Sequence, residues 1–165
     1  MDYLVKKVEF DDLILKMEFW DTAGQERFRS VIQQYYCDSL AVIVVFDLTD
    51  PKSFKDLDYW AQQISGFFDD EVIRFLLGNK SDMGDKIKIK NEEIEEFVNK
   101  YNFQYFETSA KLNKGLHECF GKLAIQIKEK FYKYKKNSFD VHKLTLIRPN
   151  EGKKGDEIKK EGFCC

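Results

Sequence analysis

The sequence predicts an α/β domain in which a mostly parallel β-sheet is flanked by helices. Residues 40–46 (LAVIVVF) are apolar throughout and rich in β-branched side chains, a pattern typical of a strand buried on both faces of a parallel sheet. After this segment, amphipathic helical stretches alternate with short strands, the order expected of a layered α/β fold. The 165 residues are 43% hydrophobic with only two prolines, so the composition suits a buried core.

The beginning of the chain is predicted to form two strands joined by a tight turn. The first strand covers residues 3–10 and the second covers residues 13–20. In the second strand, apolar side chains at Leu15, Met17 and Phe19 alternate with charged ones. This period of two predicts a strand with one face against the core.

Three helices are predicted after residue 50, separated by strands over residues 72–78 and 104–106. Asp50 is predicted to be the N-cap of the first helix because proline follows it, and Asn91 is predicted to cap the second. The apolar stripes of the three helices run from Phe54 to Phe68, from Ile94 to Tyr101 and from Leu116 to Phe131. Cys119 lies on the last stripe and is therefore predicted to be a small core residue.

Charge divides the chain into a body and a tail. Residues 1–132 carry 18 Lys and Arg against 24 Asp and Glu, a net charge of −6, whereas residues 133–165 carry 9 against 5, a net charge of +4. An acidic body argues against nucleic-acid binding, and the basic tail favours a negatively charged membrane surface. Apolar periodicity fades after residue 132, so residues 133–165 are predicted to be a flexible tail.

The first polar motif, residues 20–28 (WDTAGQERF), directly follows a predicted strand. An acidic residue at such a strand end, here Asp21, can hold a magnesium ion through water. Gly24 lets the backbone approach a terminal phosphate, and Gln25 can orient an attacking water. The alternative is an acidic turn that only ends a strand, but the whole run of specified residues favours the functional interpretation.

Two further polar motifs also follow predicted strands. In the first, the Asp82 carboxylate can accept two hydrogen bonds from guanine, whereas adenine offers no such pair of donors. The stem of Lys80 can lie over the base, and Asn79 can tie adjacent loops together. In the second motif, residues 108–111 (TSAK), small side chains allow a backbone N–H to reach a base carbonyl. Alone, the first of these motifs is equally well explained as a polar turn, and the second is better explained as an ordinary turn that leads into a helix.

The three motifs in this order resemble those of the Ras superfamily of small GTPases. Residues 45–49 (VFDLT), the Tyr35-Tyr36 pair and the terminal Cys164-Cys165 are similar to the Rab branch in particular. The resemblance covers residues 2–132 and the terminal pair, with a local departure at residues 37–39. It implies a small-GTPase-like (P-loop NTPase) fold that binds GTP or GDP with magnesium and hydrolyses GTP.

The resemblance also implies a role for each matching residue. Asp21 would hold magnesium through water, Gly24 would contact the γ-phosphate, and Gln25 would position the catalytic water. Guanine would be bound by a set from both later motifs, namely Asn79, Lys80, Asp82, Ser109, Ala110 and Lys111. The aromatic surface for effectors would comprise Trp20, Tyr35 and Tyr36. Further partners implied by the family are an exchange factor, a GTPase-activating protein and the prenylation machinery, with no nucleic acid.

The family's phosphate loop, Gly-x-x-x-x-Gly-Lys-[Ser/Thr], does not occur in the 165 residues. The resemblance implies that the chain begins inside the second strand of the family fold and so lacks the first strand, the phosphate loop, the first helix and the first switch. We therefore expect weak binding of GTP, GDP and magnesium. We also expect marginal stability, because the missing strand would lie between the strands at 13–20 and 40–47.

Three explanations of this absence remain open. The most economical is an incomplete gene model or a missed first exon, in which case the complete protein is a Rab-like GTPase acting as a molecular switch in vesicle trafficking. The second is a genuine short form that binds partners at a membrane without nucleotide, as a pseudo-GTPase. The third is an inactive fragment.

The tail carries the last motif, the double cysteine Cys164-Cys165. It resembles the Rab ending that is geranylgeranylated on both thiols. Two lipid chains give stable anchoring, and the basic tail adds attraction to anionic lipid. We therefore expect the protein at the cytoplasmic face of an intracellular membrane, with a cytosolic pool. The alternatives are incidental thiols or half of a metal site.

Overall fold

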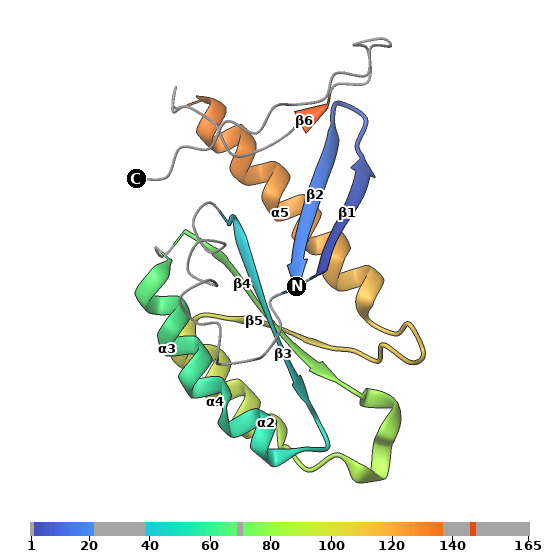
Figure 1. Cartoon of the computed structure of the whole chain (residues 1–165), viewed down its shortest axis with the longest axis vertical. Coiled ribbons are helices and arrows are strands. Elements are labelled where there is room, and N and C mark those ends of the chain that lie inside the picture. Colours follow the sequence, from blue (N-terminus) through green and yellow to red (C-terminus); the bar gives the residue numbers. More distant parts are fainter. Residues whose placement is uncertain (1, 22–38, 69–70, 137–145, 148–165) are drawn as a thin grey trace.

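The computed structural model describes residues 2–21, 39–68, 71–136 and 146–147 (Figure 1). These residues form two three-stranded sheets, in the orders β1-β2-β6 and β3-β4-β5. Long helices pack on the second sheet, and one of them also covers the first. The predicted α/β class is therefore confirmed.

The second sheet is parallel throughout. β3 (Ala41–Asp47) pairs with β4 (Ile73–Asn79), and β4 pairs in turn with β5 (Gln104–Glu107). The register places Asp47 opposite Asn79, so β3 and β4 end at the same level. Because all three strands run in one direction, the residues that follow them gather at one edge of the sheet.

The predicted hairpin at the start of the chain is confirmed. β1 (Asp2–Glu9) and β2 (Ile14–Asp21) pair antiparallel, and the Phe10 N–H donates to Leu13 O at 2.8 Å in the turn. Leu15 and Met17 are buried, as the alternating pattern requires.

A short strand that the sequence did not predict joins this hairpin. β6 (Leu146–Ile147) pairs antiparallel with Ile14 and Leu15 of β2. It belongs to the segment predicted to be a flexible tail. It lies on the edge of β2 that faces away from β1. In the part of the chain that the structure describes, β2 and β3 lie in different sheets.

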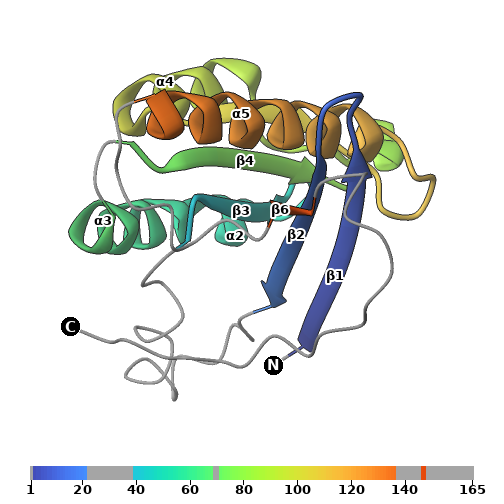
Figure 2. The ribbon, with the colours of Figure 1, turned by 90° about the horizontal axis from the view of Figure 1, so that it is seen from above.

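Helices cover the parallel sheet on both faces, with two on one side of the strands and the longest on the other (Figure 1). In the view of Figure 2 the longest helix overlaps the helix of residues 91–101, although the two lie on opposite faces of the sheet. On one face, α3 (Leu57–Phe67) and α4 (Asn91–Tyr101) pack over β4. On the other face, α5 (Leu116–Lys136) packs over both β4 and β2. The two buried cores are represented by Leu57, Ile64, Leu76, Ile94 and Phe97 on the first face, and by Leu15, Phe75, Cys119, Leu123 and Ile127 on the second.

Cys119 is confirmed as a small core residue of α5. Its side chain is fully buried, and burial raises the pKa of its thiol to about 11. A thiol that stays protonated at neutral pH is a poor nucleophile, so Cys119 serves packing. α5 itself continues to Lys136, beyond the boundary predicted at residue 132.

The helix predicted after Asp50 is divided into two. α2 (Pro51–Lys55) ends at Lys55, and Asp56 separates it from α3, which begins at Leu57. The Asp50 cap is confirmed, because its side chain accepts the Lys52 N–H at 3.0 Å.

The predicted cap of α4 is wrong. Asn91 is the first helical residue, and Lys90 occupies the cap position. The side chain of Glu93 accepts the Lys90 N–H at 3.1 Å, so the reciprocal half of a capping box holds this helix end.

The prediction that residues 40–46 are buried on both faces is also wrong. Phe46 is 2% exposed, but its neighbour Val45 on the opposite face is 56% exposed. β3 lies at the edge of the parallel sheet, and the core beneath α5 reaches Ala41 and Ile43 but not Val45. A covering helix therefore protects only the first half of this face.

We predict that Gly115→Ala destabilises the protein. Gly115 has φ +74°, and an added Cβ would lie 2.2 Å from the backbone oxygen of Glu107. Both the positive φ and the backbone clash oppose any side chain, so the free energy of unfolding should fall by about 2–3 kcal/mol in urea titrations.

Gly66→Ala is the matched control. Gly66 lies inside α3, and an added Cβ would meet nothing within 4 Å. Alanine is a better helix former than glycine, so the free energy of unfolding of this variant should rise by about 0.5–1 kcal/mol. Equal effects of the two substitutions would contradict the account of Gly115.

Candidate functional site

Two of the three predicted polar motifs meet at one edge of the parallel sheet. Residues 79–82 follow β4 and residues 108–111 follow β5. The Thr108 N–H donates to Gly78 O at 2.8 Å, and the Ser81 N–H donates to Thr108 O at 3.0 Å. These backbone bonds fix the two loops against each other, as the strand-end argument predicted.

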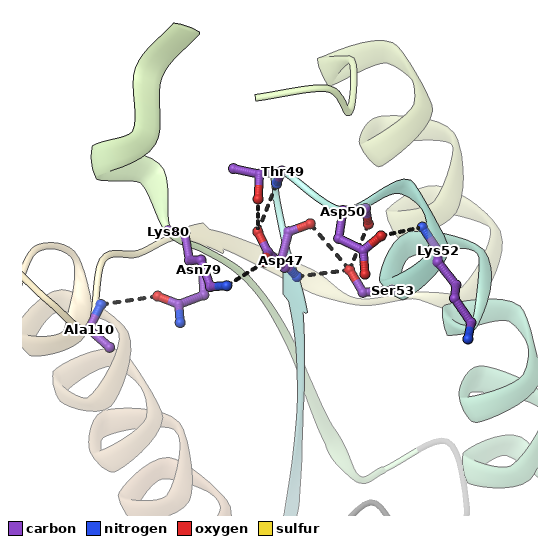
Figure 3. A network of polar contacts seen from close by, with 8 residues as sticks. All are labelled: Asp47, Thr49, Asp50, Lys52, Ser53, Asn79, Lys80 and Ala110. Carbon is purple, nitrogen blue, oxygen red and sulfur yellow. Dashed lines mark hydrogen bonds and ion pairs between the residues drawn. The ribbon is translucent and has the colours of Figure 1, made fainter. Parts of the chain in front are cut away.

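Asn79 ties the two loops together through its side chain (Figure 3). Its Oδ1 accepts the backbone N–H of Ala110 at 3.0 Å. The Asn79 backbone oxygen also accepts the Leu48 N–H at 3.0 Å, which connects the site to the end of β3. The prediction that Asn79 ties adjacent loops together is therefore confirmed by these two hydrogen bonds.

Asp82 is held by the serine of the second motif. The Ser109 hydroxyl donates to Asp82 Oδ1 at 2.6 Å, and the same hydroxyl accepts the Leu112 N–H at 3.1 Å. Ser109 is fully buried, so it forms a fixed support for the carboxylate.

Asp82 is ionised at neutral pH. The hydrogen bond from Ser109 lowers the pKa of Asp82 below its ordinary value of 3.8, and the positive charges of Lys111 and Lys80 add to this effect. An ionised carboxylate accepts hydrogen bonds only, and Ser109 uses one of about four acceptor positions. Asp82 is therefore suited to bind a group with adjacent N–H donors.

Lys80 has an unusual backbone and a fixed side chain. Its φ is 66° and its ψ is 34°, the left-handed region that non-glycine residues seldom adopt. Its Nζ lies 2.6 Å from Asp47 Oδ2, and this hydrogen bond raises the pKa of the ammonium group. The sequence predicted a role for the Lys80 stem but not this partner.

Asp47 is the site residue that the sequence analysis missed. Burial alone would raise its pKa, but hydrogen bonds from Lys80 and Thr49 outweigh this effect and lower it. The signal was present, because Asp47 ends a predicted parallel strand just as Asp21 ends its own. Only the register between β3 and β4 reveals its partner.

The first motif lies largely outside the described residues. Asp21 ends β2, but its side chain is not described, and Gly24, Gln25, Tyr35 and Tyr36 lie in residues 22–38. Cys164 and Cys165 also lie outside the described residues. Trp20 is described, on β2, and is 44% exposed.

Within the described ranges, no three His, Cys, Asp or Glu side chains cluster closely enough to hold a metal ion. The magnesium site predicted at Asp21 depends on the side chain that is not described. What the described residues bring together, at one edge of the parallel sheet, is an ionised carboxylate, a side-chain amide and an ammonium group.

Comparison with known proteins assigns the chain to a family. Residues 1–129 match the profile of the Ras family. The chain belongs to the Ras family. Its curated relatives, which include Ras-related Rab-13 proteins, place it in the Rab branch. It is 34% identical to the GTP-binding protein YPT1 of Saccharomyces cerevisiae over 165 residues. That match covers 100% of this chain and 79% of YPT1.

Other relatives of this Rab-type chain match a shorter region. It is 39% identical over 127 residues to the Ras-related protein Rab-13 of Rattus norvegicus, covering 77% of this chain and 63% of Rab-13. It is 38% identical over 130 residues to the GTP-binding protein ypt1 of Schizosaccharomyces pombe, covering 79% of this chain and 64% of that protein. The chain therefore spans less than two thirds of the length of several relatives.

We predict that Ser109→Ala raises the pKa of Asp82 in this Rab-type chain toward 3.8, because the main hydrogen bond to the carboxylate is lost. In the wild type, the lowered pKa stabilises the fold above pH 3.8, and this contribution disappears as the pH falls through the folded-state value. The variant should therefore lose less stability than the wild type as the pH falls below about 4.

Carboxyl ¹³C NMR measures the pKa of Asp82, and urea unfolding measures the pH dependence. Asp58 serves as the internal control, since hydrogen bonds from Tyr101 and Lys100 lower its pKa. The pKa of Asp58 should not move in the variant. An unchanged pKa of Asp82 would refute the role assigned to Ser109.

Proposed function

We propose that this protein is a Rab-like GTP-binding switch in vesicle trafficking, and that its described part recognises the guanine ring. The observation that carries the proposal is the Asp82 carboxylate, held by Ser109 at 2.6 Å beside the Asn79–Ala110 tie of 3.0 Å. Membership of the Ras family supports the wider role.

Asp82 would accept two hydrogen bonds from guanine, at the ring N–H and at the exocyclic amino group. Adenine has no equivalent pair of donors, so a buried or partly buried carboxylate rejects it. The lowered pKa of Asp82 keeps the acceptor ionised throughout the physiological range. The carboxylate acceptor of this site therefore fits the two adjacent donors of guanine.

The loop of residues 109–111 supplies the donor for the guanine carbonyl. The Ser109 N–H donates to Lys114 O at 3.0 Å, and the Ala110 N–H donates to Asn79. In this proposal a backbone N–H of residues 109–111 reaches the guanine carbonyl, because the small side chains of Ser109 and Ala110 let the base approach.

The phosphate chemistry would lie in the first motif. In this proposal Asp21 holds magnesium through water, Gly24 contacts the γ-phosphate, and Gln25 aligns water for hydrolysis of GTP to GDP and phosphate. Magnesium would offset the negative charge of the phosphates. Residues 1–165 contain no Gly-x-x-x-x-Gly-Lys-[Ser/Thr] loop, so this chain should hold GTP and magnesium weakly.

The proposed cellular setting rests on the aromatic surface for effectors and on the C-terminal cysteine pair. Effectors would bind Trp20, Tyr35 and Tyr36, and an exchange factor and a GTPase-activating protein would act on the nucleotide site. Among the described residues, no helix combines the length and the hydropathy needed to cross a bilayer. We propose that lipid chains on Cys164 and Cys165 hold the protein at the cytoplasmic face of an intracellular membrane.

We predict that Asp82→Asn weakens guanosine binding by about 10- to 100-fold, because the variant loses the charge and presents an amide donor to the donors of guanine. Guanosine is the appropriate probe because it requires only the base site. An NMR titration of the whole chain measures the affinity, with adenosine as the comparison ligand.

Asp85→Asn is the matched control for this substitution. Asp85 lies in the same 3₁₀ helix η2 (Ser81–Lys86), and its side chain is exposed. This variant should bind guanosine like the wild type. Equal affinity of the wild type for guanosine and adenosine would refute base recognition and would favour a partner-binding module that works without nucleotide.

We predict that replacing both Cys164 and Cys165 with serine releases the protein from membranes into the cytosol, because both proposed lipid attachment sites are lost. Cell fractionation measures the distribution. The single Cys119→Ser variant, altered in the core of α5, controls for general effects of losing a thiol. Unchanged membrane association of the double variant would contradict the lipid anchor.

A further inference from the structure

A network of polar contacts centred on Asp47 lies beside the proposed guanine site (Figure 3). Asp47 is the last residue of β3 and lies opposite Asn79 in the register of the parallel sheet. Lys80 directly follows Asn79, and its Nζ lies 2.6 Å from Asp47 Oδ2. The contact therefore joins the end of β3 to the motif that follows β4.

Asp47 is itself held in place by its own turn. Its Oδ1 accepts the Thr49 N–H at 2.8 Å and the Thr49 hydroxyl at 2.7 Å. Its backbone N–H donates to Ser53 Oγ at 3.0 Å, and that hydroxyl lies 2.8 Å from Asp50 O. One carboxylate oxygen is thus committed to the turn, and the other faces Lys80.

Lys80 needs such a partner if its side chain is to have one position. The side chain is 55% exposed, and an exposed lysine loses much rotamer freedom when it is fixed. The residue before it is already fixed, because Asn79 Oδ1 accepts the Ala110 N–H. The contact with Asp47 also fixes the end of the Lys80 side chain, so both Asn79 and Lys80 are held in place.

We propose that Asp47 is a positioning residue of the guanine site, which holds the Lys80 ammonium group so that the Lys80 stem lies ready against the plane of the base. This inference rests on the proposed function. Preorganisation of this kind raises affinity because the ordering is complete before the ligand arrives. The competing explanation is that Asp47 only stabilises the turn of residues 47–50.

Guanosine titrations of the full 165-residue chain separate the two explanations. Asp47→Asn retains an oxygen for the Thr49 donors but loses the charge that holds Lys80. Lys80→Met retains an unbranched stem but loses the ammonium group. Asp47→Asn should weaken guanosine binding about tenfold, and should weaken it no further when Lys80→Met is already present.

Two control variants accompany this double-mutant cycle of Asp47→Asn and Lys80→Met. Asp58→Asn removes another exposed lysine partner, since Asp58 Oδ1 lies 3.0 Å from Lys100 Nζ, and it should leave guanosine binding unchanged. Thr49→Val removes a hydroxyl donor from the turn but leaves the Asp47–Lys80 contact. It should lower the thermal unfolding temperature while changing guanosine affinity less than twofold.

A readout without ligand tests the positioning directly. The ε-methylene ¹³C signal of Lys80 reports the pKa and the mobility of its side chain. Asp47→Asn should lower this pKa and increase this mobility. Unaltered guanosine affinity in Asp47→Asn, or losses that add fully in the double variant, would overturn the inference while leaving the proposed function intact. Failure of the wild type to bind guanosine would instead overturn the proposed function, and with it the effect of Asp47 on the site.

Discussion

The parallel register of β3, β4 and β5 is the constraint on which the rest of the structure depends. It places Asp47 opposite Asn79 and Gly78 opposite Glu107, so three chain segments leave the sheet at one edge. Each segment then supplies a short polar run that finds its partners on a neighbouring run. The hydrophobic cores on both faces keep the strands in this register, and the polar contacts at their ends are a consequence of it.

Local patterns were enough to predict most of the fold. The alternation at Leu15 and Met17 and the apolar stripes of α3, α4 and α5 are properties of short segments, and each proved correct. The errors occurred where the outcome depends on distant partners. β6 exists only through its pairing with β2, and the exposure of Val45 depends on how far the core beneath α5 extends.

The same distinction applies to the site. Asn79, Asp82, Ser109 and Ala110 could be predicted to meet because each follows a strand of one parallel sheet. The Asp47–Lys80 contact could not be predicted, because it needs both the strand register and the left-handed backbone of Lys80. The residues of the proposed base site lie within the described part of the chain, whereas the proposed phosphate chemistry belongs to the segment around Asp21. In the proposed function, recognition of the ring and handling of the phosphates therefore depend on different segments of the chain.

The position of β3 at the edge of its sheet has a consequence for self-association. Residues 40–46 contain no charge and no proline, and Val45 is 56% exposed. Within the described residues, this strand pairs on one side only. Apolar β-branched segments with an open backbone edge are templates for intermolecular cross-strand assembly. At high concentration, or while newly made chains are still folding, this strand is where aggregation would nucleate.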